Sequence, residues 1–154
     1  MSVQGSIGTT LRVAVGAPET YDLAGIDTLQ ATATLVGEIS SYGEYGGSGT
    51  VETHTPVDTG VVNKAIGVID YGQLSLSIGK DTTDAGQIML KAGFDGDKAR
   101  QRHTFIVTFP DGTREAFTGK ISSFTTNPGS AGPFVAGTCN VELDNQVLAL
   151  EAID

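Results

Sequence analysis

The sequence predicts a mainly β protein, a sandwich or barrel of about seven to eight strands with one flanking α-helix. Glycine makes up 21 of the 154 residues, about twice its usual share of roughly 7%. Several segments alternate between apolar and polar residues, with the two-residue period of a half-buried strand. Clusters of Gly, Pro, Asn and Asp separate these segments and indicate turns. These observations favour a single β domain over residues 1–154.

The first part of the chain alternates between extended segments and loops. Residues 1–10 are polar and contain glycine, which is typical of a flexible N-terminal arm. Strand alternation begins in residues 10–15 and returns in residues 31–40. Residues 16–30, "GAPETYDLAGIDTLQ", mix Gly, Pro and Asp with scattered apolar side chains, and we expect an ordered loop there.

A glycine-rich stretch follows, within "EISSYGEYGGSGTVETHTPV". Its four glycines, Gly43, Gly46, Gly47 and Gly49, favour a long mobile loop, which we place at residues 40–62. The strand pattern resumes in "VVNKAIGVI" and is clearest in "QLSLSIG", where leucine and isoleucine alternate with serine.

One segment, "KDTTDAGQIMLKAGFDG", has helical periodicity. Ala85, Ile88, Met89 and Ala92 fall at positions i, i+3, i+4 and i+7 and would form one apolar stripe. We expect Asp81 or Thr82 to cap the first turn, Asp84 to lie within that turn, and Gly93 or Gly96 to end the helix.

The last third of the chain contains the clearest hairpin signal. "HTFIVTF" and "REAFTGKISSF" flank Pro110-Asp111-Gly112, a sequence typical of a tight turn. A final strand is predicted in "FVAGTCNVELD". The tail at residues 146–154 is apolar for its length, so we expect it to pack against another surface.

The charge and the single cysteine exclude several classes of protein. The net charge of −9 disfavours specific nucleic-acid binding, because an acidic surface repels phosphates. Cys139 stands alone, which excludes an intrachain disulfide and a cysteine-cluster zinc site. The first residues do not have the pattern of a signal peptide, and no apolar run is long enough for a membrane span. We expect a soluble protein that is made or assembled in a reducing cytoplasm.

The glycine-rich stretch does not fit a phosphate-binding loop. A Walker loop needs a lysine after its second glycine, and neither Lys nor Arg occurs between Arg12 and Lys64. A dinucleotide-binding loop needs a third glycine where this sequence has Glu52, and it opens a helix rather than a strand.

No other group of residues predicts catalysis or metal binding. "DTTDAG" has too few oxygen ligands for a calcium loop, and Asp95 with Asp97 fits a solvated turn better than a cation site. A pair of Cys139 with His54 or His103 is conceivable, but Cys139 lies on the apolar face of its strand and fits an inert core thiol. We therefore expect no enzyme activity, no cofactor and no metal.

Several motifs in order resemble the major tail tube proteins of long-tailed, non-contractile bacteriophages. They are "APETYDLAGI", "VGEISSYGEYGG", "VETHTPVDTGVVNKAIGVIDYG", "LSLSIGKDTTDAGQIMLKA" and "FPDGTREAFTGKISSF", followed by an alternating strand. The resemblance covers about residues 15–145, nearly the whole chain. It implies the tail tube fold, a β-sandwich with a flanking helix. Some relatives add an immunoglobulin-like domain at the C-terminus, and we expect none in this chain.

The resemblance also implies a role and a set of partners. Members of the family form hexameric rings that stack into the tube through which the genome leaves the capsid. The expected partners are further copies of the chain and the tail tip or baseplate, tape measure and tail terminator proteins. Double-stranded DNA would pass through an acidic lumen without specific binding, and no membrane would be involved. The location would be the tail of the virion, after assembly in the host cytoplasm.

Two groups of residues are the expected assembly sites. For the loop that contacts the neighbouring ring, the expected residues are Tyr42, Gly43, Tyr45, Gly46, Gly47, Gly49 and Val51, with the two tyrosines as anchors. For the lumen, the candidates are Glu38, Glu52, Glu115, Glu142 and Asp144. The N-terminal arm and the C-terminal tail are further candidates for contacts between subunits.

Two other interpretations of the sequence remain open. One is a ring subunit of a related bacterial secretion tube, which would share the fold and also form hexamers. The other is a monomeric β-sandwich binding module, for example one that binds carbohydrate. Such a module would expose aromatic platforms, but the chain has no Trp and only four Tyr.

Overall fold

The computed structural model describes residues 3–129 and 134–151 of the chain. Within these ranges there are ten strands and two helices. The main sheet contains β1 (Thr10–Val15), β2 (Thr34–Val36), β3 (Ile39–Tyr42), β6 (Gln73–Gly79), β7 (His103–Thr108), β8 (Arg114–Asn127), β9 (Ala136–Leu143) and β10 (Leu148–Leu150). A separate ribbon contains β4 (Ser48–His54) and β5 (Asn63–Asp70), and the helices are α1 (Leu23–Gln30) and α2 (Ala85–Asp95). The predicted mainly β fold is confirmed, with more strands than expected and a second helix.

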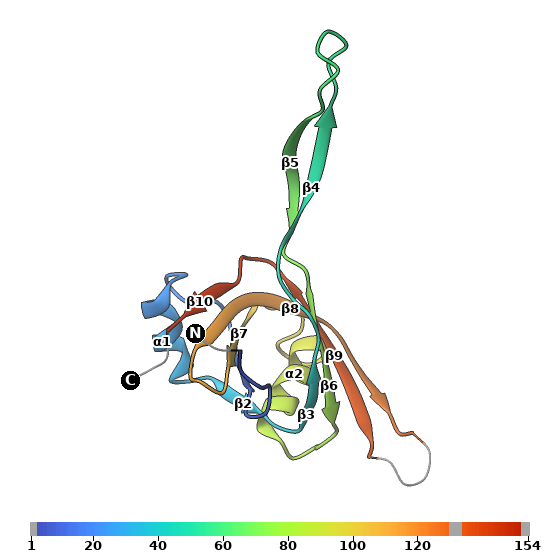
Figure 1. Ribbon diagram of the computed structural model, residues 1–154. Helices are drawn as coiled ribbons and strands as arrows, with labels where there is room; N and C mark the ends of the chain where they lie inside the picture. Colours follow the sequence, from blue (N-terminus) through green and yellow to red (C-terminus); the bar gives the residue numbers. More distant parts are fainter. Residues whose placement is uncertain (1–2, 130–133, 152–154) are drawn as a thin grey trace.

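The long strand β8 connects two halves of the main sheet (Figure 1). The sheet order is β2-β1-β7-β8-β9-β6-β3, with β10 also paired to β8. Residues 114–119 of β8 pair with β7, whereas residues 119–127 pair with β9. We call β2, β1, β7, β10 and the first part of β8 the first half-sheet. The second part of β8 with β9, β6 and β3 is the second half-sheet.

The two half-sheets share one apolar core. Phe105 and Phe117 of the first half-sheet stack with their ring centroids 5.6 Å apart. Leu76, Cys139 and Val141 of the second half-sheet belong to the same buried cluster. The predicted alternation is confirmed in β6 and β9, where every second residue is in the core. Strand β7 is buried on both faces.

Helix α2 forms where predicted, but its cap and its buried face differ from the prediction. Asp84, rather than Asp81 or Thr82, is the N-cap, and Gly96 is the C-cap. The buried residues are Gly86, Gln87, Leu90 and Gly93, while Ala85 and Ile88 are exposed and Met89 and Ala92 are partly buried. The helix approaches β2 at Gly86, and Gly93 faces Ile121 and His103. A Cβ on Gly86 would lie 2.4 Å from the carbonyl oxygen of Leu35, so the small residues face inward.

Residues 16–30 contain a helix, so the prediction of a loop over this range is wrong. The Asp22 side chain accepts a hydrogen bond from the Gly25 amide and caps α1. Ile26 is the only buried residue of this helix. It packs with Ile106 and Ala116 on the face of the first half-sheet opposite the main core. Helix α1 thus covers the outer face of the first half-sheet.

The structure confirms one predicted hairpin, divides one predicted strand and describes part of the predicted tail. The hairpin between β7 and β8 is confirmed, with Gly112 at φ 94° and the Phe109 amide bonded to the Thr113 carbonyl at 2.9 Å. The strand predicted at residues 31–40 is split, because Glu38 adopts φ 61° between β2 and β3. The predicted tail packs partly as β10, while residues 1–2 and 152–154 lie outside the described part.

Candidate functional site

A β-hairpin projects from the domain as an arm, which we define as residues 48–70 (Figure 1). Strands β4 and β5 pair from Ser48 with Asp70 to His54 with Asn63. The long loop predicted at residues 40–62 is therefore corrected: its first residues lie in β3 and its second half is a strand and a hairpin tip. Every residue of β4 and β5 is exposed. Since neither face is buried, the usual burial alternation of a strand is absent here.

Near its root, one face of the arm is apolar. Val51 pairs with Ile66, and Gly49 pairs with Ile69, so these residues lie on the same face. Val51, Ile66 and Ile69 are all more than half exposed. An isolated two-stranded ribbon is marginally stable in water, and a contiguous apolar surface of this kind marks an interaction site. The arm is therefore a candidate contact surface for another protein chain.

The two tyrosines predicted as anchors for a neighbouring ring pack inward instead. Tyr45 lies with its ring centroid 5.1 Å from that of Phe117, and its hydroxyl donates a 2.6 Å hydrogen bond to Glu115. Burial raises the Tyr45 pKa far above its ordinary value, and the Glu115 carboxylate raises it further. Burial also raises the pKa of Tyr42 to about 12. Both rings are partly buried against the core, so they fasten the root of the arm to its own domain.

Glycines at the root of the arm allow the two backbone segments that enter and leave it to cross closely. A Cβ on Gly72 would lie 2.5 Å from the carbonyl oxygen of Gly46, and one on Gly43 would lie 2.9 Å from that of Ser75. Gly46 and Gly72 also have positive φ angles of 140° and 90°. These positions need glycine for close backbone contact and unusual φ values. The predicted mobility is not the reason for glycine here.

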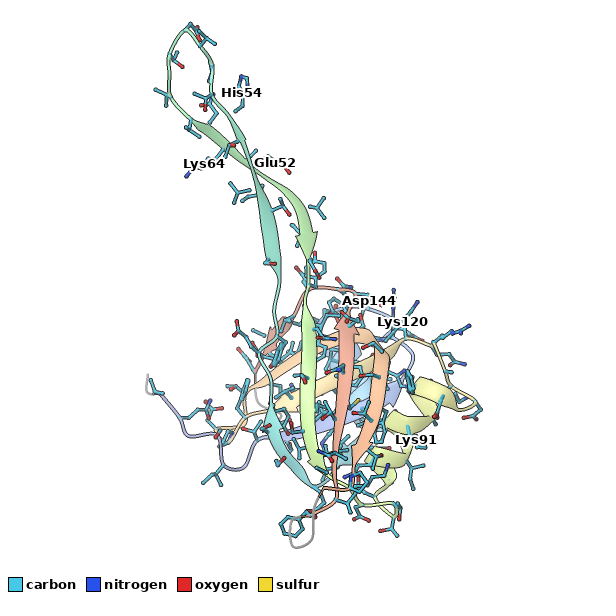
Figure 2. All side chains as sticks on the ribbon, turned by 90° about the vertical axis from the view of Figure 1, so that its right-hand side faces the viewer. Glu52, His54, Lys64, Lys91, Lys120 and Asp144 are labelled. Carbon is cyan, nitrogen blue, oxygen red and sulfur yellow. The ribbon has the colours of Figure 1, made fainter. Side chains whose placement is uncertain are left out.

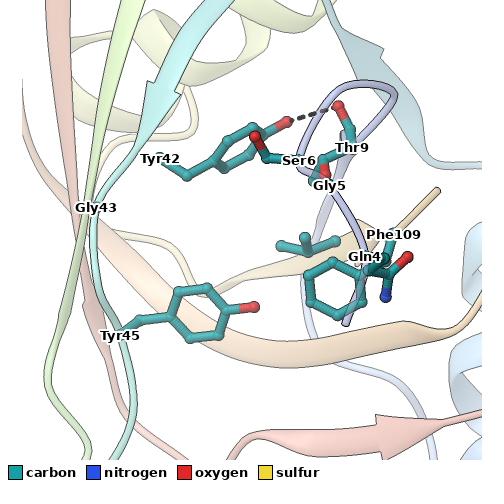
Figure 3. A pocket seen from close by; sticks show the side chains of 9 residues that line it. Gln4, Gly5, Ser6, Thr9, Tyr42, Gly43, Tyr45 and Phe109 are labelled. Carbon is teal, nitrogen blue, oxygen red and sulfur yellow. Dashed lines mark hydrogen bonds between the residues drawn. The ribbon is translucent and has the colours of Figure 1, made fainter. Parts of the chain in front are cut away.

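A pocket lies between this root and the N-terminal segment (Figure 3). It has a volume of about 380 Å³. The Tyr42 hydroxyl donates to the Thr9 carbonyl at 3.4 Å, and Gln4 accepts a hydrogen bond from the Asp111 amide at 3.0 Å. The predicted N-terminal arm is thus attached at two points in residues 3–9, although its side chains Val3 and Ile7 are exposed.

The outer face of the second half-sheet is polar and is covered by neither described helix. Three rows of aligned residues cross it, one each from β6, β9 and β8. The rows are Gln73, Glu142 and Lys120; Ser75, Asn140 and Ser123; and Ser77, Thr138 and Thr125. We call these nine residues the polar face. Its only two charges are opposite and adjacent, so the polar face is neutral and consists mainly of short hydroxyl and amide side chains.

The polar face ends in two free strand edges. Strand β3 has a partner only in β6, and residues 120–127 of β8 pair only with β9 among the described strands. Free edges present unpaired amide and carbonyl groups to other chains. The second half-sheet can therefore be extended by another strand on either side.

The five acidic residues predicted for the lumen do not form one patch. Glu142 is the only one on the polar face, where it accepts a 2.8 Å hydrogen bond from Gln73. Asp144 follows β9 and pairs with Arg102 at 2.8 Å. Glu52 lies on the arm (Figure 2), Glu38 lies between β2 and β3, and Glu115 bonds to Tyr45.

The described residues contain no group of three His, Cys, Asp or Glu side chains that could hold a metal ion. Cys139 is buried, as predicted, and burial raises the pKa of its thiol to about 12. His54 is exposed on the arm and His103 is buried beneath α2, so the structure brings neither histidine to Cys139. None of the helices in the described ranges is both long and apolar enough to cross a membrane.

Comparisons with known proteins identify structures that share this fold. No family model and no curated protein matches the sequence. The structure resembles a chain of the anti-feeding prophage baseplate, 6-fold symmetrised, with a TM-score of 0.69 and 10% identity over 98% of each chain. It resembles a chain from the tail of an empty GTA particle with a TM-score of 0.63 and 14% identity, covering 96% of this chain and 98% of that one.

The SPP1 tail tube structure matches as well, with a TM-score of 0.63 and 11% identity, covering 99% of this chain and 81% of that one. At these identities the comparisons establish the fold and not the activity. The chain has the fold of proteins found in tails and contractile injection systems.

Proposed function

We propose that the chain is the repeating subunit of a tail tube, in which copies form hexameric rings and the rings stack into a hollow tube. The observation that carries this proposal is a bare polar half-sheet with two free edges beside a projecting, uncovered arm. The shared fold with a chain from a tail refined in C6 symmetry supports the sixfold ring, and the match to the SPP1 tail tube supports the stacking.

Ring closure would use the two edges of the second half-sheet. Strand β3 of one subunit would pair with residues 120–127 of β8 in the next subunit. Repeated around the ring, this pairing would produce a closed barrel in which no edge remains exposed. The polar face would then line the lumen, and α1 would lie outside, because it covers the opposite half-sheet.

A lumen of this composition would let DNA pass without holding it. Binding to DNA depends on basic residues that neutralise phosphates and release counterions. The polar face has one lysine, Lys120, opposite Glu142, and so offers little net attraction. Of the predicted lumen residues, Glu142 lies on this face, and Glu38, Glu52, Glu115 and Asp144 would be rim residues at most. The proposed lumen is therefore weakly acidic at its rims and neutral along its wall.

The proposed partners are those of a tail. They are further copies of the chain, tail tip or baseplate, tape measure and tail terminator proteins, with double-stranded DNA passing through. The proposed location is the virion tail, after assembly in the host cytoplasm. The matched structures include a baseplate, a sheath/tube terminator and a tube-terminating cap, which supports a tube with distinct ends. The ordered sequence motifs favour a long non-contractile tail.

A second candidate is the inner tube of a contractile injection system. Matches to the anti-feeding prophage baseplate and to a PVC sheath-tube complex favour it. The two candidates differ in the presence of a sheath around the tube. A gene for a sheath protein beside the gene for this chain would favour the injection system.

Negative-stain microscopy of the concentrated, purified chain tests the proposal. We expect hollow tubes, or rings that lengthen into tubes when tail tips are added. A variant in which residues 48–70 are replaced by a two-residue turn should form rings at most. A strict monomer at every concentration, with and without tail tips, would contradict the proposal.

A further inference from the structure

A second apolar site lies at the end of the molecule opposite the arm. Strand β6 begins at Gln73 beside the root of the arm and ends at Gly79. At that far end, Gly79 pairs with Ala136 and Ile78 pairs with Ile39. The far end of the second half-sheet and the tip of the arm therefore lie at opposite ends of the molecule (Figure 1).

The far end contains a pocket with a volume of about 440 Å³. Its lining includes Glu38, Ile39, Gly79, Lys80, Phe134 and Val135. Phe134 is 89% exposed and Val135 is 44% exposed. Large apolar side chains this exposed around a hollow mark a place where another apolar group can be buried.

Lys80 lines this pocket and places a fixed positive charge beside it. Its Nζ atom donates a 2.7 Å hydrogen bond to the Thr126 hydroxyl and lies 5.1 Å from the centroid of the Phe124 ring. Two acids share the site. The Asp81 carboxylate already accepts hydrogen bonds from the amide and hydroxyl of Thr83. The Gly79 amide donates to the Glu38 backbone carbonyl at 2.7 Å, and no donor in the described part of the chain bonds the Glu38 carboxylate.

The tip of the arm has the complementary composition. Val57, Val61 and Val62 are exposed there, with Val57 fully accessible to solvent. Asp58 follows Val57, and Lys64 lies two residues after Val62 on β5. The tip thus combines apolar groups with one acid and one base, and the pocket combines apolar groups with Lys80 and two acids. Strand β4, from Ser48 to His54, spans about 20 Å at roughly 3.4 Å per residue, and the tip lies beyond it.

We infer that the far-end pocket receives the tip of the arm of a second copy of this chain. Val57 and Val61 would be buried against Phe134 and Val135, and Asp58 would lie opposite Lys80. Because donor and acceptor lie at opposite ends, the contact is head-to-tail and leaves a free arm and a free pocket at the two ends of a stack, so it continues indefinitely. This inference rests on the proposed stacking of rings and identifies the surface that receives the arm.

A charge exchange tests the predicted pair. Lys80→Glu and Asp58→Lys should each raise the concentration needed for tube formation about tenfold or more, because each variant places like charges together. The double variant should return that concentration to within about threefold of the unmodified chain, since it restores the opposite charges. Lys91→Glu makes the same charge change on the exposed face of α2 and should leave assembly unchanged.

Disulfide trapping gives a readout that does not depend on charge. A chain with both Val57→Cys and Phe134→Cys, oxidised after assembly, should produce a ladder of covalent multimers on a denaturing gel. Val57→Cys combined with Thr28→Cys, on the exposed side of α1, should not. The native Cys139 is buried and does not interfere.

The outcomes separate this inference from the proposed function. Tubes that form normally from both single charge variants, without any ladder, would overturn the pocket as the receiving site and leave the tube proposal standing. Absence of tubes from the unmodified chain would overturn both. Rescue by the double variant together with the ladder would support both.

Discussion

Gly72 lies at the root of the arm, where the two backbone segments that enter and leave it cross closely. Its φ is +90°, and a Cβ would lie 2.5 Å from the Gly46 carbonyl oxygen. We predict that Gly72→Ala lowers the free energy of unfolding by about 1–3 kcal/mol, because it adds a backbone clash to an unfavourable φ. Urea unfolding followed by circular dichroism would measure this loss.

Gly60 provides the matched control for that substitution. Its φ is also positive, at +67°, but a Cβ there would have nothing within 4 Å. Gly60→Ala therefore tests backbone strain without the clash, and we expect a smaller loss than at Gly72. Equal losses at the two positions would show that the close crossing of the chains contributes nothing.

His103 makes stability depend on pH. Its side chain is fully buried, and desolvation holds its pKa below the ordinary value of 6.5, partly offset by a hydrogen bond with the Gln101 carbonyl. Its Nε2 atom has no hydrogen-bond partner in the described part of the chain. As the pH falls through about 6.5, the unfolded chain takes up a proton that the folded chain does not, so folding is destabilised.

We therefore predict that the free energy of unfolding is nearly constant between about pH 7 and 8 and falls below about pH 6.5, by no more than about 1.4 kcal/mol per pH unit from this group. His103→Gln should flatten this dependence, whereas His54→Gln, on the exposed arm, should retain it. Asp22, Asp81 and Asp111 have lowered pKa values from hydrogen bonds and would act only at lower pH. A flat profile from pH 7 to 5 in the unmodified chain would contradict the prediction.

At the scale of elements, buried Arg114 joins three segments. Its guanidinium donates to Asp27 and Gln30 of α1 at 2.6 Å each, and to the Glu151 carbonyl beyond β10 at 2.9 and 2.7 Å. The Tyr21 hydroxyl bonds the Gln146 carbonyl, which also attaches this tail. Arg114 thus connects β8, α1 and the C-terminal strand.

We predict that Arg114→Met costs roughly 2 kcal/mol and loosens the C-terminal strand first, because charged hydrogen bonds to that strand and to α1 are lost. Asp27 is 43% exposed, so it can be solvated by water after the change. Limited proteolysis and hydrogen exchange at residues 146–151 would detect the loosening. Unchanged protection there would show that β10 is held by its pairing with β8 alone.

The arm should contribute little to the stability of the domain. Neither of its strands contributes a residue to the buried core. Replacing residues 48–70 by a two-residue turn should therefore change the free energy of unfolding by less than about 1 kcal/mol, while the roots at Tyr45 and Gly72 remain. Thermal unfolding of the shortened chain would check this. A large decrease in its free energy of unfolding would show that the arm stabilises the domain.

These elements also show how far the sequence predicts the fold. Strands β1, β6 and β9 were predictable because each buries mainly one face, so burial appears as alternation in the sequence. Strand β7 is buried on both faces, and the turn residues after it predicted the hairpin. Helix α1 was not, since only Ile26 faces a core and one residue makes no periodic stripe. The first strand of the arm was predicted as part of a loop, because a ribbon exposed on both faces has no burial pattern and the glycines at 43, 46, 47 and 49 favoured a loop. The second strand was predicted from the pattern in residues 61–69.

The candidate site was predictable in position but not in detail. The segment around Tyr42 and Tyr45 does lead into the projecting element. Their inward packing depends on partners such as Glu115, which is 70 residues away in sequence, and a single sequence does not reveal such long-range contacts. The far-end pocket was missed for the same reason, because it joins residues near positions 38, 80 and 134.

At the scale of the whole molecule, charge should oppose association. The chain has 18 acidic and nine basic residues, so copies repel one another. Raising the salt concentration from about 10 to 100 mM shortens the screening length from about 30 to 10 Å. We predict that tubes form at lower protein concentration at the higher salt, as measured by light scattering. Weaker assembly over this range would show that specific ion pairs outweigh the overall repulsion.

Because β8 belongs to both half-sheets, one strand would connect the inner wall of a tube to its outer surface. The second half-sheet would set the bore, while α1, the C-terminal strand and the first half-sheet would form the exterior. Substitutions on α1 could then diversify the outside, for example its antigenicity, without altering the diameter of the channel. Inserting a small tag into the solvent-exposed side of α1 should accordingly decorate the tube and leave its bore unchanged.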